Sequence, residues 1–232
     1  MTMEQTTKAK PAATLAEKAN TLRAGVLGAN DGILTVVGVL FSVAAATTNP
    51  FTIFIAGLAD LLACAFSMAS GEYASVSSQK DTEQAVVDQE AVLLETDHET
   101  ERQIAIDYYK ERGVTTETAT QIADDLLQKN ALATMIRIKY SLELGHYMNP
   151  WSAAWSSMFS AALGGIFPLM AMTLLPVNLQ WPGTIVAVTA AVTITGFMSA
   201  KLGDGLVKRA MIRNVVIGLI TMAIHYGIGQ IL

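Results

Sequence analysis

The sequence has one cysteine, few charges and none of the common enzyme motifs. A single cysteine among 232 residues excludes a disulfide framework, and there is no CxxC pair of the kind that binds zinc. P-loop, nucleophile-elbow, HExxH and dinucleotide-binding glycine patterns are also absent. Charged residues make up 15% of the chain and hydrophobic residues 52%, a balance typical of a membrane protein. We therefore expect an integral membrane protein that is not an enzyme and holds no prosthetic group.

Five apolar runs are long enough to cross a bilayer as helices, which takes about 20 residues. They lie at about 24–46, 51–74, 152–175, 183–200 and 214–232. The sequence therefore predicts an all-α fold, built as a five-span integral membrane helix bundle.

A polar segment separates the second and third runs. Residues 75–149 contain fourteen acidic and seven basic residues. Helical periodicity and two helix-ending glycines, Gly113 and Gly145, predict three helices there. The second span continues to about Leu94, and the other two helices cover about 99–112 and about 115–144. The predicted organisation is thus an arm at 1–22, two spans at 23–74, an acidic three-helix domain at 75–149 and three spans at 150–232.

The basic residues indicate how the chain crosses the membrane. All 15 lie at or before Arg23, within 75–149, or within 201–213, and the connections at 47–50 and 176–182 have none. The positive-inside rule then places the N-terminus and the acidic domain in the cytoplasm. Because these residues flank spans, they do not form a nucleic-acid-binding patch.

A polar stripe runs along the second span. Asp60, Cys64, Met68 and Glu72 recur every four residues, which places them on one helix face. An acidic side chain within a span normally faces a bundle interior or a water-filled path. We interpret Asp31, Met68 and Glu72 as the entry of a cation path and Asp60 as a deeper step. The alternatives are that the acids bond neighbouring helices and that Met68 and Cys64 only pack.

The mixture of donors indicates the kind of metal. Carboxylates with a thioether suit a borderline transition metal such as Fe²⁺ or Mn²⁺, whereas Mg²⁺ and Ca²⁺ prefer oxygen alone. In the acidic domain, five acids within twelve residues would repel one another unless a cation intervenes, although a solvated surface is the alternative. These acids are Glu90, Glu95, Asp97, Glu99 and Glu101.

Two histidines and a glycine pair are weaker candidates. His98 could join the acidic cluster, and His225 in the fifth span could handle protons, although packing is the simpler interpretation. Gly28 and Gly32 have the GxxxG spacing of close helix contacts or of a dimer seam.

Several motifs together resemble those of the vacuolar iron transporter family. They are Gly28-Ala-Asn-Asp-Gly32, Ser67-Met-Ala-Ser-Gly-Glu-Tyr73, Ser77-Ser-Gln-Lys-Asp81, Asn149-Pro-Trp151 and Tyr226-Gly-Ile-Gly229. The resemblance covers about residues 20–232. It implies a homodimer that exports Fe²⁺ or Mn²⁺ from the cytosol in exchange for protons, with the path between the first spans. It also implies metal ligands at Asp31, Asp60 and Met68, while Glu72 matches a glutamate of prokaryotic members.

The acidic domain departs from the family pattern, which implies a glutamate-rich site that collects metal. Glu90, Glu101 and Glu143 occupy family positions, and Glu95 or Asp97 could substitute for missing ligands. Leu93 and Ile104 replace two glutamates, and Lys139 and Tyr140 replace methionines. We therefore expect this domain to bind fewer ions, or to bind them with lower affinity, and we expect the route through the membrane to be unaffected.

Three functions follow from these patterns. The leading hypothesis is a proton-coupled Fe²⁺/Mn²⁺ exporter in a bacterial plasma membrane, or in a vacuolar membrane if the source is eukaryotic. A membrane-anchored metal sensor or buffer is the second hypothesis, and a transporter of another divalent cation is the third.

Overall fold

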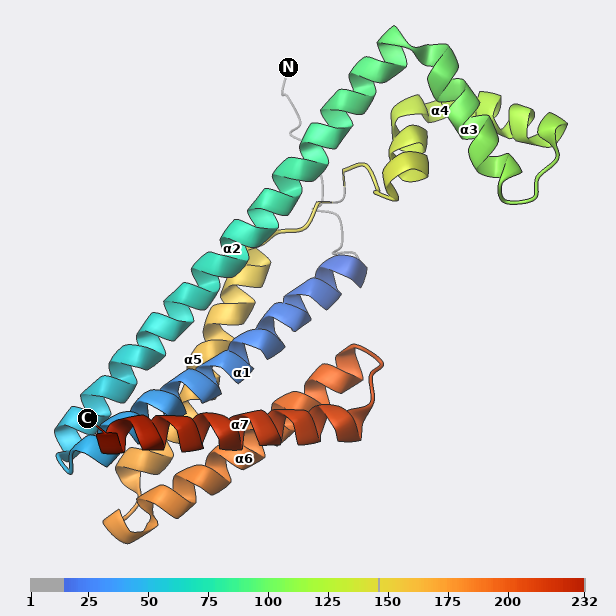
Figure 1. Cartoon of the computed structure of the whole chain (residues 1–232). Helices are drawn as coiled ribbons and strands as arrows, with labels where there is room; N and C mark the ends of the chain where they lie inside the picture. Colours follow the sequence, from blue (N-terminus) through green and yellow to red (C-terminus); the bar gives the residue numbers. More distant parts are fainter. Residues whose placement is uncertain (1–14, 146, 232) are drawn as a thin grey trace, which may run out of the picture. The chain divides into compact units, whose positions relative to one another are not determined.

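The computed structural model describes residues 15–145 and 147–231, and these residues form seven helices and no strand (Figure 1). The helices are α1 (Leu15–Ala46), α2 (Pro50–Thr96), α3 (His98–Lys110), α4 (Thr116–Tyr140), α5 (Pro150–Leu174), α6 (Val177–Leu202) and α7 (Val207–Ile231). The predicted all-α class is confirmed. Five of the helices, α1, α2, α5, α6 and α7, are long and apolar enough to cross a membrane, as the apolar runs predict.

The chain divides into two compact units. One contains the chain up to Ala74 and again from Asn149, and the other is Ser75–Met148. Helix α2 contributes to both, because its first half lies in the unit of spans and its second half joins α3 and α4.

Glycines let α1 and α5 approach closely. A Cβ added at Gly28 would lie 2.5 Å from the Ser157 carbonyl oxygen, and one added at Gly32 would overlap the Ala161 carbonyl. From the other side, a Cβ at Gly164 would meet the backbone of Ala29. Small residues at such contacts allow backbones to pack directly in a membrane. The GxxxG pair therefore serves a helix contact within the chain.

An apolar core fills the unit of spans around this contact. Helix α1 supplies its centre, and Val36, Val37 and Leu40 have no exposed surface. Leu169 and Met172 of α5 pack against them from another helix. Because α1 contacts α5, α6 and α7, its polar residues are also held in fixed positions.

The second unit has its own apolar core, in which small side chains lie where α3 packs against α4. Ala105 of α3 and Ala119 and Ala123 of α4 have no exposed surface, so these two helices lie close together. An ion pair joins the same helices, with Arg102 Nη2 2.9 Å from Asp124 Oδ2. Hydrogen bonds from Arg102 hold the pKa of Asp124 below its usual value.

Three helices begin earlier than predicted. α1 begins at Leu15 instead of about residue 24, so the end of the predicted arm is helical, while residues 1–14 lie outside the described part of the chain. α6 begins at Val177, so most of the predicted link at 176–182 is helix. α7 begins at Val207 and includes basic residues that the sequence placed in a turn. Apolar length marks a span, but a helix continues wherever backbone hydrogen bonds can continue.

Helix α4 differs from the prediction in two ways. It ends at Tyr140 instead of about residue 144, because Ser141 adopts a left-handed conformation with φ 57°. It also breaks at Asn130, whose φ of −161° is not helical and whose side chain accepts a hydrogen bond from the Ala133 N–H. Asn130 thus caps the second part of α4. The predicted stop at Gly113 is confirmed, with φ 86°.

We predict that Gly32→Ala destabilises the protein by about 1–3 kcal/mol, the usual cost of overpacking a tight contact. The added methyl group must push α1 away from the Ala161 backbone. Thermal unfolding in detergent micelles measures this change.

Gly71→Ala is the matched control, since nothing lies within 4 Å of a Cβ at Gly71. That variant should unfold at or slightly above the wild-type temperature, because alanine favours the helix. Equal unfolding temperatures for the two variants would show that the glycine contact is not tight.

Candidate metal path

An acid and a thiol meet where α1 faces α2. The Cys64 thiol donates a hydrogen bond to Asp31 Oδ2 over 3.4 Å. Asp31 is half-buried and Cys64 is buried. The position of Asp31 follows from the glycine contact, because Gly28 and Gly32 hold this part of α1 against α5. A carboxylate and a thiol thus face each other inside the bundle of spans.

Asp60 lies beside this pair, one helical turn from Cys64. It is close enough to Asp31, His225 and the Thr35 hydroxyl to interact with them electrostatically. Its Oδ2 atom is buried, and among the described residues this atom has no hydrogen-bond partner. An unsatisfied buried carboxylate oxygen needs an explanation, such as an ion or a water molecule.

Met68 borders the same place from the other side of Cys64. It packs against the apolar cluster that Cys64 forms with Ala65 and Ala161. Met68 therefore borders the residues around Cys64, as the stripe on the second span indicates. Asp31, Asp60, Cys64 and Met68 form a group of two carboxylates and two sulfur atoms, which we call the path cluster.

Glu72 does not join the path cluster. Its carboxylate pairs instead with Arg23, whose Nη2 lies 3.4 Å from Glu72 Oε2. Glu72 is 7% exposed and stands two turns of α2, about 12 Å, from Cys64. The predicted entry group of Asp31, Met68 and Glu72 is therefore split in the structure. Asp31 lies with the deeper Asp60, and Glu72 lies with an arginine.

His225 of α7 lies near the path cluster. The Ser42 hydroxyl donates to the His225 carbonyl oxygen over 3.0 Å and lies 3.1 Å from the ring nitrogen Nδ1. The other ring nitrogen, Nε2, faces Gly38, where a Cβ would lie only 2.9 Å from it. The imidazole thus stands within electrostatic range of Asp60.

Sequence reasoning missed Thr35 and Arg23 as partners of these acids. Thr35 follows Asp31 by four residues on the same helix face, a spacing that could have identified it. Arg23 was counted only as a topology signal. No spacing rule connects it with Glu72, since the two lie 49 residues apart.

One chain offers an incomplete site for a metal ion. Among residues 15–145 and 147–231, no three His, Cys, Asp or Glu side chains come close enough together to hold one. The path cluster supplies three such side chains, Asp31, Asp60 and Cys64, but they do not converge on one position where an ion could bind all three. A metal ion bound there would need further ligands from water, from Met68 or from another copy of the chain.

Glu90 and Glu101 of the second unit face a lysine. Lys139 Nζ lies 2.7 Å from Glu90 Oε2 and 3.0 Å from both carboxylate oxygens of Glu101. Glu90 has no exposed surface and Glu101 is 3% exposed. Burial raises the pKa of Glu101; Lys139 opposes that rise and Glu90 adds to it. Two of the predicted metal ligands are thus brought together around an ammonium group.

The other predicted ligands of the second unit lie apart from this pair. Glu95, Asp97 and His98 are exposed where α2 passes into α3. Glu143 is exposed in the segment after α4. The five acids within twelve residues therefore do not gather around one ion.

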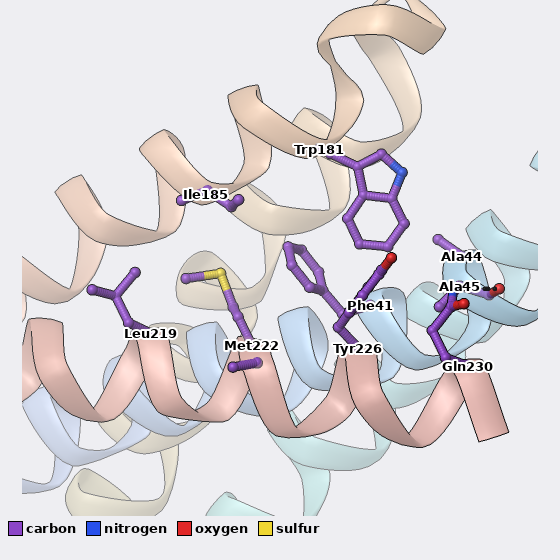
Figure 2. A pocket seen from close by; sticks show the side chains of 10 residues that line it. Phe41, Ala44, Ala45, Trp181, Ile185, Leu219, Met222, Tyr226 and Gln230 are labelled. Atoms are coloured by element: carbon purple, nitrogen blue, oxygen red, sulfur yellow. Dashed lines mark hydrogen bonds between the residues drawn. The ribbon is translucent and has the colours of Figure 1, made fainter.

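Two cavities in the unit of spans lack metal ligands. The first, about 650 Å³, lies between α1, α6 and α7 and is lined by Phe41, Trp181 and Tyr226, whose rings meet edge to face (Figure 2). It offers no carboxylate, thiol or imidazole. The second, about 490 Å³, is lined by Arg23 and Arg213 and would repel a cation. Neither cavity competes with the path cluster as a metal site.

Helices and site together define an all-helical, multi-pass membrane protein with facing acidic side chains inside its bundle of spans. A model of the VIT family matches residues 22–230, so the chain belongs to the VIT family. The resemblance found in the motifs is therefore confirmed.

Named relatives agree with this membership. The chain is 35% identical over 209 residues to the vacuolar iron transporter of Acanthamoeba castellanii, covering 90% of this chain and 77% of the relative. It is 30% identical to vacuolar iron transporter homolog 3 of Arabidopsis thaliana, covering 93% and 85%. Homolog 5 of Oryza sativa subsp. japonica is also 30% identical, covering 92% and 81%. All three relatives carry the name of a vacuolar iron transporter or of a homolog of one.

We predict that Arg23→Gln destabilises the protein by about 1 kcal/mol, because it leaves the buried Glu72 carboxylate without its cation. The figure is well below that for breaking a fully buried pair, since the Arg23 side chain is 58% exposed. Thermal unfolding in micelles at neutral pH measures it.

Arg23→Lys, which keeps the charge, and Lys18→Gln, which removes an exposed charge from the same helix, are the controls. Both should unfold near the wild-type temperature. If Lys18→Gln lowers that temperature as much as Arg23→Gln does, the loss comes from net charge and not from the contact with Glu72.

Proposed function

We propose that this protein transports Fe²⁺ or Mn²⁺ out of the cytosol in exchange for protons, with the path cluster as its cation route. The observation that carries this proposal is the buried, unpartnered Asp60 oxygen beside the Asp31–Cys64 pair. An acid left unsatisfied within a span is costly, and such acids usually mark ion routes or proton relays. Membership of the VIT family and the names of its relatives support the same conclusion.

The donors of the path cluster suit the proposed cargo. Asp31 and Asp60 supply charged oxygen, while Cys64 and Met68 supply sulfur. Borderline divalent ions accept this mixture, whereas Mg²⁺ and Ca²⁺ favour oxygen ligands alone. Water can complete the coordination because Asp31 and Asp60 are only half-buried.

Exchange with protons follows from the same carboxylates. Each binds a cation when ionised and loses its charge when protonated, so protons arriving from the far side release the metal. The imidazole of His225 stands within electrostatic range of Asp60, and its ring packs against Gly38 of α1. A proton can therefore pass between a histidine and an acid at the deeper end of the path cluster.

The basic residues support the direction of export. With the N-terminus in the cytosol, five spans place all fifteen basic residues and the Ser75–Met148 unit on the cytosolic side. We place the protein in a plasma membrane in this orientation. Because the described residues of one chain do not enclose a metal ion, we further propose a homodimer in which a second copy adds ligands to the route.

The alternative of a metal sensor or buffer is less well supported. It would need ligands in the Ser75–Met148 unit, and there Glu90 and Glu101 are already paired with Lys139. A flux assay in which Fe²⁺, Mn²⁺ and other divalent ions compete would identify the preferred cargo.

We predict that Asp31→Asn lowers the flux of Fe²⁺ and Mn²⁺ into proteoliposomes about tenfold or more, as changes at a metal's immediate surroundings commonly do. Asparagine keeps the shape of aspartate and an oxygen that accepts the Cys64 bond, but it removes the charge. A metal-sensitive dye inside the vesicles measures the flux.

Asp125→Asn is the matched control, because Asp125 is exposed on α4. It should transport like the wild type. If Asp31→Asn transports metal as fast as the wild type, the path cluster is not the cation route.

We also predict that metal entry into wild-type proteoliposomes raises the internal pH, because protons leave as metal enters. Asp60→Asn should abolish this pH change and lower metal flux, since asparagine cannot carry a proton. A pH-sensitive dye in the vesicles follows the reaction. Metal flux through the wild type with no pH change would contradict exchange and leave transport itself standing.

A further inference from the structure

Each of the three helices of the Ser75–Met148 unit contributes one charged residue to a single cluster. Glu90 comes from α2, Glu101 from α3 and Lys139 from α4. The Lys139 ammonium lies 2.7 Å from Glu90 and 3.0 Å from two oxygens of Glu101, so it touches three carboxylate oxygens at once. Tyr140 adds a weaker contact, with its hydroxyl 3.4 Å from Glu90 Oε2. The distances from Lys139 are close to those of charge-assisted hydrogen bonds.

The cluster has the form of a cation site. Two carboxylates converge on one point from different helices, and both are buried. Glu90 Oε1 is also buried and has no hydrogen-bond partner among the described residues. One ammonium does not satisfy every oxygen of two buried acids, and burying such acids without compensation is costly. The acids therefore require a cation, and the chain supplies one from its own α4.

An ammonium group excludes a metal ion from the same place. It has three N–H donors and no lone pair while it is charged, so it cannot act as a ligand. A divalent ion within reach of Glu90 and Glu101 would lie beside a positive charge at close range. The two carboxylates can serve the lysine or a metal, and not both.

We propose that Glu90 and Glu101 form a cation site that the chain closes with its own Lys139, so that the Ser75–Met148 unit takes up a divalent metal there only when this ammonium is removed. The lysine takes the place of a structural metal ion, because its ammonium joins α4 to α2 and α3. This inference is independent of the proposed transport function, because it concerns occupancy of a site away from the path cluster.

Lys139→Met tests the proposal in the full-length protein in micelles. Methionine keeps an unbranched side chain of similar length and replaces the ammonium with a thioether, which borderline metals accept. The electron paramagnetic resonance signal of free Mn²⁺ measures how many ions each chain binds. We expect one more bound Mn²⁺ per chain than in the wild type, or an affinity about tenfold higher or more at that site.

Two further variants make this result specific. Lys110→Met removes an exposed lysine that pairs with Asp107 in the same unit, and it should bind as much Mn²⁺ as the wild type. Adding Glu90→Gln to Lys139→Met should abolish the extra ion. The proposal is overturned if folded Lys139→Met binds no more Mn²⁺ than the wild type, or if Glu90→Gln alone removes an ion that the wild type already holds.

A measurement on the unaltered chain covers the case in which Lys139→Met does not fold. An amine-acylating reagent followed by mass spectrometry reports how accessible each lysine is. Lys139 should react much more slowly than the exposed Lys110, and saturating Mn²⁺ should not change its rate. A faster reaction of Lys139 with Mn²⁺ present would show that metal displaces the ammonium, which contradicts a closed site.

Discussion

Asp31 and Cys64 meet inside the bundle of spans because α1 is held against α5 by direct backbone contact. Gly28 and Gly32 permit that contact, and it fixes the face of α1 that looks toward α2. The Cys64 thiol can then reach the Asp31 carboxylate. Asp60, one turn before Cys64 on α2, comes close enough to interact electrostatically with both. A carboxylate in an apolar bundle must be compensated. Asp60, whose buried Oδ2 atom has no hydrogen-bond partner among the described residues, thus lies where these two helices meet.

Buried acids occur in both units, and the chain compensates them in different ways. Glu72 has a half-exposed arginine, and Glu90 and Glu101 share Lys139. Within residues 15–145 and 147–231, only Asp60 combines a buried, unpartnered oxygen with acidic, thiol and imidazole neighbours and no lysine or arginine among its interacting groups. A cation passing through the bundle would therefore be stabilised most at Asp60. The same comparison explains why the second unit, despite its many acids, is not where we place the metal. Its buried carboxylates already have an intramolecular cation.

Some of this was predictable from sequence, because apolar length and four-residue spacing depend on local geometry. Five spans, the continuous α2 and the stripe of Asp60, Cys64 and Met68 are of this kind. The pairing of Asp31 with Cys64, of Glu72 with Arg23, and of two glutamates with Lys139 could not be read from spacing. Each joins residues from different helices, at separations of 33 to 49 positions, and depends on how those helices pack. Helix starts were also mispredicted, since polar residues extend α1 and α7 beyond their apolar parts.

The most direct test of the account is to locate the ion itself. Anomalous scattering from crystals of the full-length protein grown with Mn²⁺ would show where the metal rests in the spans. The account predicts a peak within coordination distance of the Asp31 and Asp60 carboxylates, on the side of α2 that carries Cys64 and Met68. Ordered metal elsewhere in the spans, with Asp31 and Asp60 bonded only to neighbouring helices, would contradict it.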